Sequence, residues 1–481
     1  MTLETPATPR RISALLITAL LAGCAVGPNY VRPSTPISPT FKEAEGWVRA
    51  QPDDAAPRGD WWTVLGDPVL DKLESQVEVS NQNLAAAEAA YRQARATVSE
   101  QRAALFPTVS LNGSAQRSER GVSAGTGSGS GITIPGGGGP QNSFQLAGQA
   151  SWEPDLWGKI RRTIEAAGAQ AQASNADLAN ARLSAQSTLA TDYIALRADD
   201  ELKRLTDLTV DGYQRSLTIA TNQYNAGLTA KNDLLTAQSQ LASAQAQSAD
   251  IVRQRAQAEH AIAVLTGQAP ANFSIATAAW TLTTPDEPAG IPSLLLQRRP
   301  DIASAERKVA AANAQIGVQE AAYFPSLTLT GQGGYASNAL SSLIGSSSSF
   351  WSLGASAAET LIDFGARHAR VAEAKAAYEQ AVAEYRQTTL AAFQEVEDAL
   401  VAERVLAAEE PLRAEASQAA DQSEQIALNQ YKAGTTIYTT VVVAQATALS
   451  ARQSLLTVQS SRITAAVQLV TALGGGWSGR P

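Results

Sequence analysis

Four segments of the chain alternate between apolar and polar residues with the period of a β-strand. The first runs from Val109 to Ala115, and the others lie in 143–153, 326–335 and 351–357. Each is close to the roughly 10 residues that a membrane-crossing strand needs, with one face toward lipid and one toward water. Soluble sandwiches also contain alternating strands, which are usually shorter. Aromatic residues at the strand ends favour the lipid-facing interpretation: Trp152, Trp157, Tyr335 and Trp351.

The remaining pattern is helical and falls into four long runs. From Lys159 to Ala226 there is no proline, which predicts a helix of about 100 Å at roughly 1.5 Å per residue. Further runs cover 232–266, 367–433 and 437–473. We expect Pro411 to break the third of them, because proline removes a helical hydrogen bond. Each half of the chain therefore predicts a long helical hairpin.

These elements occur twice, because the chain is an internal duplication. "NQYNAG" at 222–227 returns as "NQYKAG" at 429–434, an offset of 429 − 222 = 207, and Trp157-Gly158 corresponds to Phe364-Gly365 at the same offset. "LFPTVSL" at 105–111 matches "YFPSLTL" at 323–329 with an offset of 323 − 105 = 218. The difference, 218 − 207 = 11 residues, predicts an insertion in the glycine-rich stretch 125–139. The hexapeptides mark the turns of the two helical hairpins.

Four strands cannot close into a barrel, and an open sheet edge in lipid leaves backbone groups unpaired. Eight strands from two chains enclose an interior that side chains fill, whereas twelve strands from three chains begin to leave a channel. A pore built from this chain therefore requires at least a trimer.

The N-terminus predicts export and lipidation. Arg10-Arg11 and the short apolar run 12–22 are typical of a signal peptide. The run ends in Leu21-Ala22-Gly23-Cys24, and Cys24 is the only cysteine of the chain. This arrangement is typical of a bacterial lipobox, so we expect Cys24 to carry lipid, the alternative being an incidental cysteine after a secretory signal. Because Ala25 follows rather than Asp, the outer membrane is favoured.

Composition and motifs give no indication of an enzyme or of a cofactor. The net charge of −8 argues against nucleic-acid binding, which needs clustered Lys and Arg. No apolar run is long enough to predict a membrane-spanning helix. A single cysteine excludes a cysteine-rich metal site. Ser123 in "GVSAG" formally fits a nucleophile motif, but a glycine-serine loop follows it where the motif needs a helix.

One long stretch, "RRPDIASAERKVAAANAQIGVQEAAYFPSLTL" at 298–329, and the closing "LGGGW" at 473–477 carry a family resemblance. Together with the lipobox and the duplication, they resemble the outer-membrane factor family, the TolC-like lipoprotein channels of tripartite efflux systems. The resemblance implies an α+β membrane protein, a trimeric 12-stranded outer-membrane β-barrel with four strands per chain, continued by a long periplasmic α-helical barrel. It implies as partners a periplasmic membrane-fusion adaptor, an inner-membrane pump of RND type and outer-membrane lipid.

The same resemblance gives roles to the two turns. Tyr224, Gly227, Tyr431 and Gly434 would lie at the periplasmic tips, where family members meet the adaptor, although turn chemistry alone also explains them. Members often carry an aspartate beyond the second tip, but Val443 stands at that position here. We therefore expect either an apolar constriction of Thr439 and Val443 or a polar one that uses Asp233.

The expected function is a passive exit channel for drugs or other small toxic compounds, located in the bacterial outer membrane and opened at its periplasmic tips. The alternatives are a structural or adhesive trimeric coiled-coil lipoprotein and a protein-exporting type I secretion channel. The expected segments are signal peptide 1–23, lipidated extension 24–68, helix 69–104, β-hairpin 105–157, helical hairpin 158–266, linker 267–300, helix 301–322, β-hairpin 323–363, helical hairpin 364–474 and tail 475–481.

Overall fold

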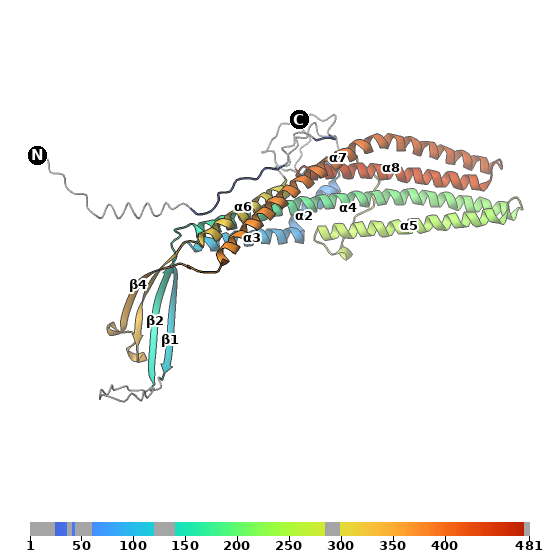
Figure 1. Cartoon of the computed structure of the whole chain (residues 1–481). Coiled ribbons are helices and arrows are strands. Elements are labelled where there is room, and N and C mark those ends of the chain that lie inside the picture. The colour runs from blue at the N-terminus through green and yellow to red at the C-terminus, as the bar shows by residue number, and fades with distance from the viewer. Residues whose placement is uncertain (1–24, 36–40, 44–59, 120–139, 284–298, 476–481) are drawn as a thin grey trace, which may run out of the picture. The chain divides into compact units, whose positions relative to one another are not determined.

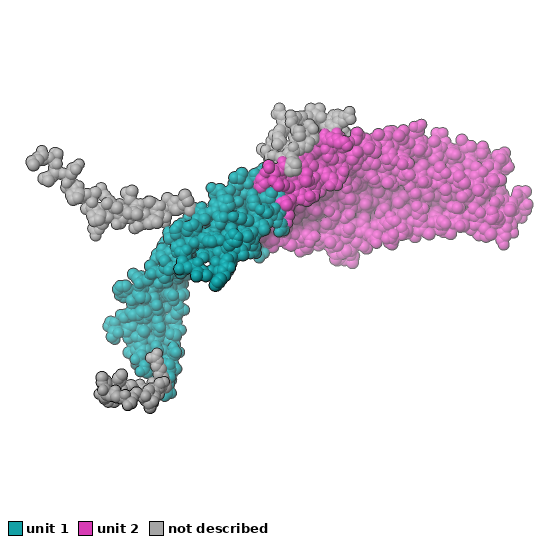
Figure 2. Space-filling model, in the orientation of Figure 1, with its two compact units in different colours: residues 1–32, 93–171, 307–382 teal, residues 33–92, 172–306, 383–481 magenta. Residues whose placement is uncertain are grey.

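A computed structural model of the chain describes residues 25–35, 41–43, 60–119, 140–283 and 299–475. They form an α+β protein, as the sequence predicts, and divide into two compact units (Figure 2). Unit 1 lies within residues 1–32, 93–171 and 307–382, and unit 2 within 33–92, 172–306 and 383–481.

The elements follow the order helix, sheet hairpin, helical hairpin, and then the same order again (Figure 1). In chain order they are the short 3-10 helix η1 (Trp61–Leu65), α2 (Pro68–Ser80), α3 (Gln82–Ala103), β1 (Thr108–Ser118), β2 (Gln141–Trp152), α4 (Lys159–Asn225), α5 (Lys231–Leu265), the 3-10 helix η2 (Pro270–Asn272), α6 (Pro300–Ala321), β3 (Ser326–Ser337), the 3-10 turns η4 (Leu340–Ser342) and η5 (Ser346–Ser348), β4 (Ser349–Ala358), α7 (Ala366–Lys432) and α8 (Tyr438–Ala472).

Unit 1 contains an antiparallel sheet in the order β1-β2-β3-β4. Residues directly opposite each other on neighbouring strands share a face of the sheet. Leu111 lies opposite Gly148, Gly148 opposite Gly333, and Gly333 opposite Trp351. The neighbouring row is polar: Ser110, Gln149, Gln332 and Ser352. The register therefore places the apolar sets of all four strands on one side and the polar sets on the other.

The apolar side of the sheet is uncovered on both outer strands. Val109 and Leu111 of β1 and Trp351 and Leu353 of β4 have exposed fractions between 74% and 79%. Large apolar side chains on a contiguous face indicate contact with something apolar outside the chain.

The helix α4 pairs with α5, and α7 pairs with α8, as two helical hairpins (Figure 1), and most of both hairpins belongs to unit 2. The ends of these helices lie within one residue of the ranges that the sequence pattern indicates. A shared core packs α2 against α4, α5, α8 and the segment after α5, and it includes Trp61, Leu70, Val77, Leu189, Tyr193, Ile194, Ile262, Ile275, Ile463 and Val467. Within the described ranges, no helix is both long and apolar enough to cross a membrane.

Two expectations about the helices are wrong. Pro411 does not break α7, which continues through it. Pro411 is exposed, so water can reach the carbonyl that loses its partner. The expected single helix 69–104 is two helices, because Asn81 ends α2 and its Oδ1 accepts from the backbone N–H groups of Asn83 and Leu84 at 2.9 and 3.0 Å. This side chain acts as the N-cap of α3.

Candidate functional site

The two repeated hexapeptides form the C-terminal ends of α4 and α7. In the first, Gly227 N–H donates to the Tyr224 carbonyl and Leu228 N–H to the Gln223 carbonyl, at 2.9 and 2.8 Å. In the second, the corresponding donors are Gly434 and Thr435, and their acceptors are the Tyr431 and Gln430 carbonyls, both at 3.0 Å. This pair of bonds defines the Schellman end of a helix. The hexapeptides are thus the same turn made twice.

Gly227 and Gly434 adopt φ values of 70° and 73°. A side chain is disfavoured in this left-handed region, whereas glycine is not. Around both glycines there is open space where a Cβ would lie. The backbone conformation, rather than crowding, therefore explains why glycine stands at both positions.

The two tyrosines of the hexapeptides have different surroundings. Tyr431 is 4% exposed, and its hydroxyl donates to Gln223 Oε1 at 2.7 Å, which ties the second turn to the first. Tyr224 is 39% exposed. The duplication therefore has one tyrosine that holds the two hairpins together and one that faces outward.

Beneath Tyr431 lies a small apolar cluster that joins both hairpins. The ring of Tyr431 lies 5.3 Å from that of Tyr438 at the start of α8. The other buried members are Ala220, Ala237, Val441 and Val442. Burial is the main cause that raises the pKa of Tyr431, and the negative charge of Asp233 adds to it. Burial also raises the pKa of Tyr438, to about 12. Both phenols keep their protons at neutral pH.

The three aperture candidates lie on the helices that leave the two turns. Asp233, in the first turn of α5, accepts a hydrogen bond from the Thr229 hydroxyl. Thr439 and Val443 are exposed and one turn apart on α8, away from the face that buries Tyr438 and Val441. The aperture remains a prediction.

The lipidation candidate Cys24 lies outside the described residues, but the segment directly after it is held in unit 1. Val26 N–H donates to the Trp157 carbonyl at 3.0 Å. The Arg162 guanidinium donates to the carbonyls of Val26 and Gly27 and to Oδ1 of Asn29, at 3.1, 3.0 and 2.9 Å. Residues 26–29 are therefore fixed to the start of α4.

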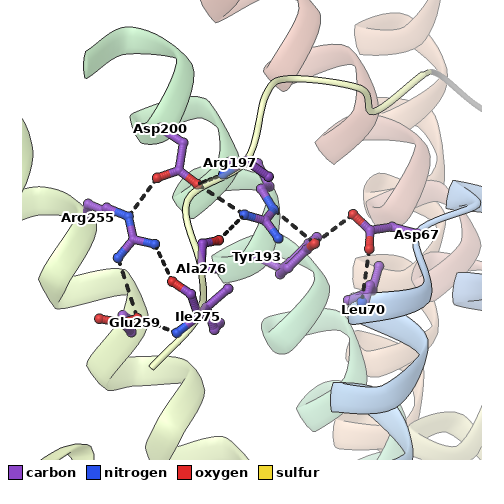
Figure 3. Close-up of polar contacts among 10 residues, drawn as sticks. Asp67, Leu70, Tyr193, Arg197, Asp200, Arg255, Glu259, Ile275 and Ala276 are labelled. Atoms are coloured by element: carbon purple, nitrogen blue, oxygen red, sulfur yellow. Dashed lines mark hydrogen bonds and ion pairs between the residues drawn. The ribbon is translucent and has the colours of Figure 1, made fainter. Parts of the chain in front are cut away.

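Sequence reasoning missed a buried ionic network in unit 2 (Figure 3). One Asp67 oxygen caps α2 by accepting from Val69 and Leu70, and the other accepts from the Tyr193 hydroxyl at 2.6 Å. Arg197 then donates to the Tyr193 hydroxyl at 2.9 Å and to Asp200 at 3.1 Å. Tyr193, Arg197 and Asp200 are neighbours on α4, but their partners Asp67, Arg255 and Ala276 are distant in the sequence, so no local pattern could reveal the network.

The same network fixes the segment that follows α5. Arg197 donates to the Ala276 carbonyl at 2.9 Å, and Arg255 donates to Asp200 and to the Ile275 carbonyl, both at 2.6 Å (Figure 3). Two arginines thus compensate the buried Asp200 carboxylate. Removing either arginine would leave the buried Asp200 carboxylate without full compensation, which is costly. The network therefore holds the segment after α5 in place.

Arg299, of the "RPDI" stretch, has a comparable role elsewhere in unit 2. It pairs with Asp301 at 2.7 Å and Glu395 of α7 at 2.6 Å, and it donates to the Ala472 carbonyl at the end of α8 at 3.0 Å. This motif residue therefore joins three helices and is structural.

Glu74 was also missed. It lies between Leu70 and Val77 on the innermost stripe of α2, and all three are 0% exposed. Neither carboxyl oxygen has a hydrogen-bond partner among the described residues. Burial, with smaller contributions from Glu78 and Asp71, raises the pKa of Glu74 to about 9. The side chain is therefore a neutral acid at pH 7.

Nowhere in the described chain do three His, Cys, Asp or Glu side chains gather as metal ligands would.

Comparison with known proteins gives concordant results. The profile of the family described as "Outer membrane efflux protein" matches residues 73–268 and 291–475. The chain is 30% identical over 473 residues to the "Probable efflux pump outer membrane protein TtgC" of Pseudomonas putida, covering 97% of this chain and 96% of that one. It is 28% identical over 480 residues to the "Cation efflux system protein CusC" of Escherichia coli, covering 98% and 99%. The crystal structure of the Campylobacter jejuni CmeC outer membrane channel superimposes with a TM-score of 0.86 at 25% identity, covering 94% of this chain and 95% of that one.

Proposed function

The chain belongs to the outer membrane efflux protein family, and from that premise we propose how it serves as the outer-membrane exit channel of an efflux pump. Three copies assemble so that their sheets close into one 12-stranded barrel. The observation that carries this proposal is the sheet register, which aligns four apolar strand faces on one side and leaves the outer strands exposed. Closure pairs the free edges of β1 and β4, which could not remain open in lipid.

The helical hairpins of the three copies form a tunnel that continues the barrel through the periplasm. Each copy contributes α4 with α5 and α7 with α8, which gives twelve helices from 3 × 4. Cargo moves passively through this tunnel. The energy comes from an inner-membrane pump, and a periplasmic adaptor connects the two.

The tips of the hairpins are the control point. Tyr431 and Gln223 hold the two turns of one chain together, and opening separates them. The exposed side chain of Tyr224 and the glycine turns at Gly227 and Gly434 present a surface on which the adaptor docks. In the closed tunnel, the narrowest point is either an apolar ring of Thr439 and Val443 or a polar ring of Asp233.

The lipid on Cys24 anchors each chain in the outer membrane, and the Arg162 contacts with Val26, Gly27 and Asn29 fix where the anchor begins. Replacing Cys24 by Ser should abolish labelling by radioactive palmitate. The barrel should still assemble, because strand pairing rather than lipid holds the trimer.

Efflux is favoured over the adhesive and protein-export alternatives, because the relatives are named as outer membrane proteins of efflux pumps. Their names refer to cations, antibiotics and toluene. Such different cargoes support a channel whose selectivity is set by the pump. We expect drugs and other small toxic compounds to pass through.

The assembly is tested by measuring the mass of the purified, detergent-solubilised protein by light scattering. We expect three chains per particle and insertion into lipid vesicles. A stable monomer that does not insert would contradict the proposal.

A further inference from the structure

One aromatic contact in unit 1 joins the two repeats of the chain. Trp157, which follows β2, stacks on Phe324 with 4.8 Å between the ring centroids and 22° between the planes. Its indole N–H also donates to the Pro325 carbonyl at 2.8 Å. Phe324-Pro325 leads into β3, so the contact lies at the junction between the neighbouring strands β2 and β3.

The duplication supplies a second copy of each half of this contact. Trp157 corresponds to Phe364 at the offset of 207, and Phe324-Pro325 corresponds to Phe106-Pro107 at the offset of 218. Phe364 follows β4 and Phe106 precedes β1, which are the two outer strands of the sheet. Phe364 is fully exposed, and Phe106 is 68% exposed. The chain therefore carries both halves of a repeated contact at its two free edges, each uncovered.

The backbone of Phe364 supports a role in an interface. Its φ is 51°, the one positive φ outside glycine among the described residues. Asp363 holds this conformation by accepting from Gly365 N–H at 3.1 Å and Arg367 N–H at 3.0 Å. A strained conformation that presents a large apolar ring to solvent indicates a constraint other than the stability of the single chain.

We propose that Phe364 of one copy packs against Phe106-Pro107 of the next copy, and that β4 pairs with β1 of that copy in the register that the duplication sets. The proposal rests on the trimer described above and specifies its contact. Each chain then meets its neighbour through a counterpart of the contact that joins its own two halves.

The register follows from simple arithmetic. Gly148 of β2 lies opposite Gly333 of β3. Adding 207 to the first number gives 148 + 207 = 355, and subtracting 218 from the second gives 333 − 218 = 115. Ala355 should therefore lie opposite Ala115 of the neighbouring copy, and Ser356 opposite Ser114.

The side-chain pattern independently agrees with this register. Ala355 and Ala115 both belong to the apolar side of the sheet, and Ser356 and Ser114 both belong to the polar side. A slip by one residue would turn the apolar side of one copy toward the polar side of the next. The predicted register keeps one apolar surface around all three copies.

Engineered cysteines test the register directly. Within one chain, β1 and β4 are separated by three strand spacings, roughly 14 Å at about 4.8 Å each. Since a disulfide needs Cα atoms within about 7 Å, any bond between the two strands must join two chains. We would compare the pairs Ala355→Cys with Ala115→Cys and Ser356→Cys with Ser114→Cys, which sample both kinds of antiparallel pair. The control is the double variant Ala355→Cys with Leu111→Cys, whose second cysteine is four residues out of the predicted register. Variants with one engineered cysteine show whether disulfides form with Cys24 instead.

We expect covalent trimers from the two register pairs on mild oxidation, and none from the control or the single variants. Register pairs that fail to cross-link, while an amine-reactive cross-linker still captures trimers, would overturn the register and leave the trimer intact. A control pair that cross-linked as readily as the register pairs would also overturn the register. Absence of trimers with either reagent would overturn both the register and the proposed assembly.

The aromatic contact has its own test. Phe364→Ala and Phe106→Ala should each make the trimer dissociate in detergent at about tenfold higher protein concentration than the wild type, whereas Leu361→Ala, at a nearby exposed residue, should not. Phe364→Trp supplies the indole donor that Trp157 has in the contact within the chain, and it should keep the trimer at least as resistant to dissociation as the wild type. Equal effects of Phe364→Ala and Leu361→Ala would overturn the contact.

Discussion

The hydroxyl of Tyr431 lies 2.7 Å from Oε1 of Gln223 and donates a hydrogen bond to it. Gln223 belongs to the first hexapeptide and Tyr431 to the second, so this bond joins the two repeats at the ends of α4 and α7. Its counterpart Tyr224 is exposed. One sequence motif thus produces one buried tyrosine that bonds to the other repeat and one exposed tyrosine.

Tyr431→Phe should favour the open state. The substitution keeps the ring in its cluster but removes a hydrogen bond worth about 1 kcal/mol, which corresponds to roughly fivefold in the closed-to-open equilibrium. We expect a matching rise in the open fraction of trimers in planar bilayers. Tyr224→Phe is the matched control and should leave the open fraction unchanged. If the two variants behaved alike, the lock would have to lie elsewhere.

Glu74→Gln should remove a pH dependence of stability. The folded pKa of Glu74 is about 9, above its ordinary value of 4.5. Between about pH 4.5 and about pH 9, the folded chain keeps the Glu74 proton that the unfolded chain releases. The stability that this proton contributes is complete below about pH 4.5, and it declines by up to roughly 1.4 kcal/mol per pH unit as pH rises to about 9. The melting temperature should therefore fall further between about pH 5 and about pH 9 in the wild type than in Glu74→Gln.

Glu88→Gln is the control for this measurement. Glu88 lies on α3, its side chain is exposed and pairs with Arg92 at 4.0 Å, and its charge is not among those that raise the pKa of Glu74. This variant should keep the pH dependence of the wild type. A Glu74→Gln protein with the full wild-type slope would show that Glu74 is ionised in the folded chain.

Gly434→Ala should destabilise the second turn by about 1 kcal/mol, because alanine is strained at positive φ although the space around it is open. Gly267→Ala should cost clearly more, because its Cβ would lie 2.2 Å from the Ser80 carbonyl oxygen in addition to the strain at φ 69°. Chemical denaturation of both variants measures the two losses. A larger loss for Gly434→Ala would indicate an unrecognised contact at the tip.

Val443→Asp should alter the conductance of the closed channel if residue 443 lines the aperture. Three carboxylates in a trimer would replace an apolar ring with a charged one, which we expect to favour cations. Val405→Asp, at an exposed position of α7, is the control. An unchanged closed-state conductance and ion selectivity in Val443→Asp would place the constriction at other residues.

Three of the four long helices could be predicted because their runs contain no proline, and the strands could be predicted from their alternation. The alternation from Val109 to Ala115 matches the sheet register, since one face of each strand is consistently apolar. The hexapeptides could be identified as turns because glycine follows a fixed spacing from the helix end. Duplication strengthens each of these predictions, as a pattern seen twice is less ambiguous than one seen once.

Features that depend on tertiary contacts could not be predicted. In the sequence alone, Asn81 fits the interior of a helix, and only its side-chain contacts show that it caps α3. Pro411 resembles a helix break, but the exposed side of α7 tolerates it. Tyr193, Arg197 and Asp200 meet partners dozens of residues away. The different roles of Tyr224 and Tyr431 arise from their neighbours, because their local sequences are almost identical.

The most direct test of the exit channel is the conductance of purified trimers in planar lipid bilayers, with the Tyr431→Phe variant measured beside the wild type. We predict discrete ion-conducting steps that are rare in the wild type and more frequent in the variant, because opening the tips opens a continuous aqueous path. Trimers that insert into the bilayer but conduct no ions, even with Tyr431 replaced, would contradict the account.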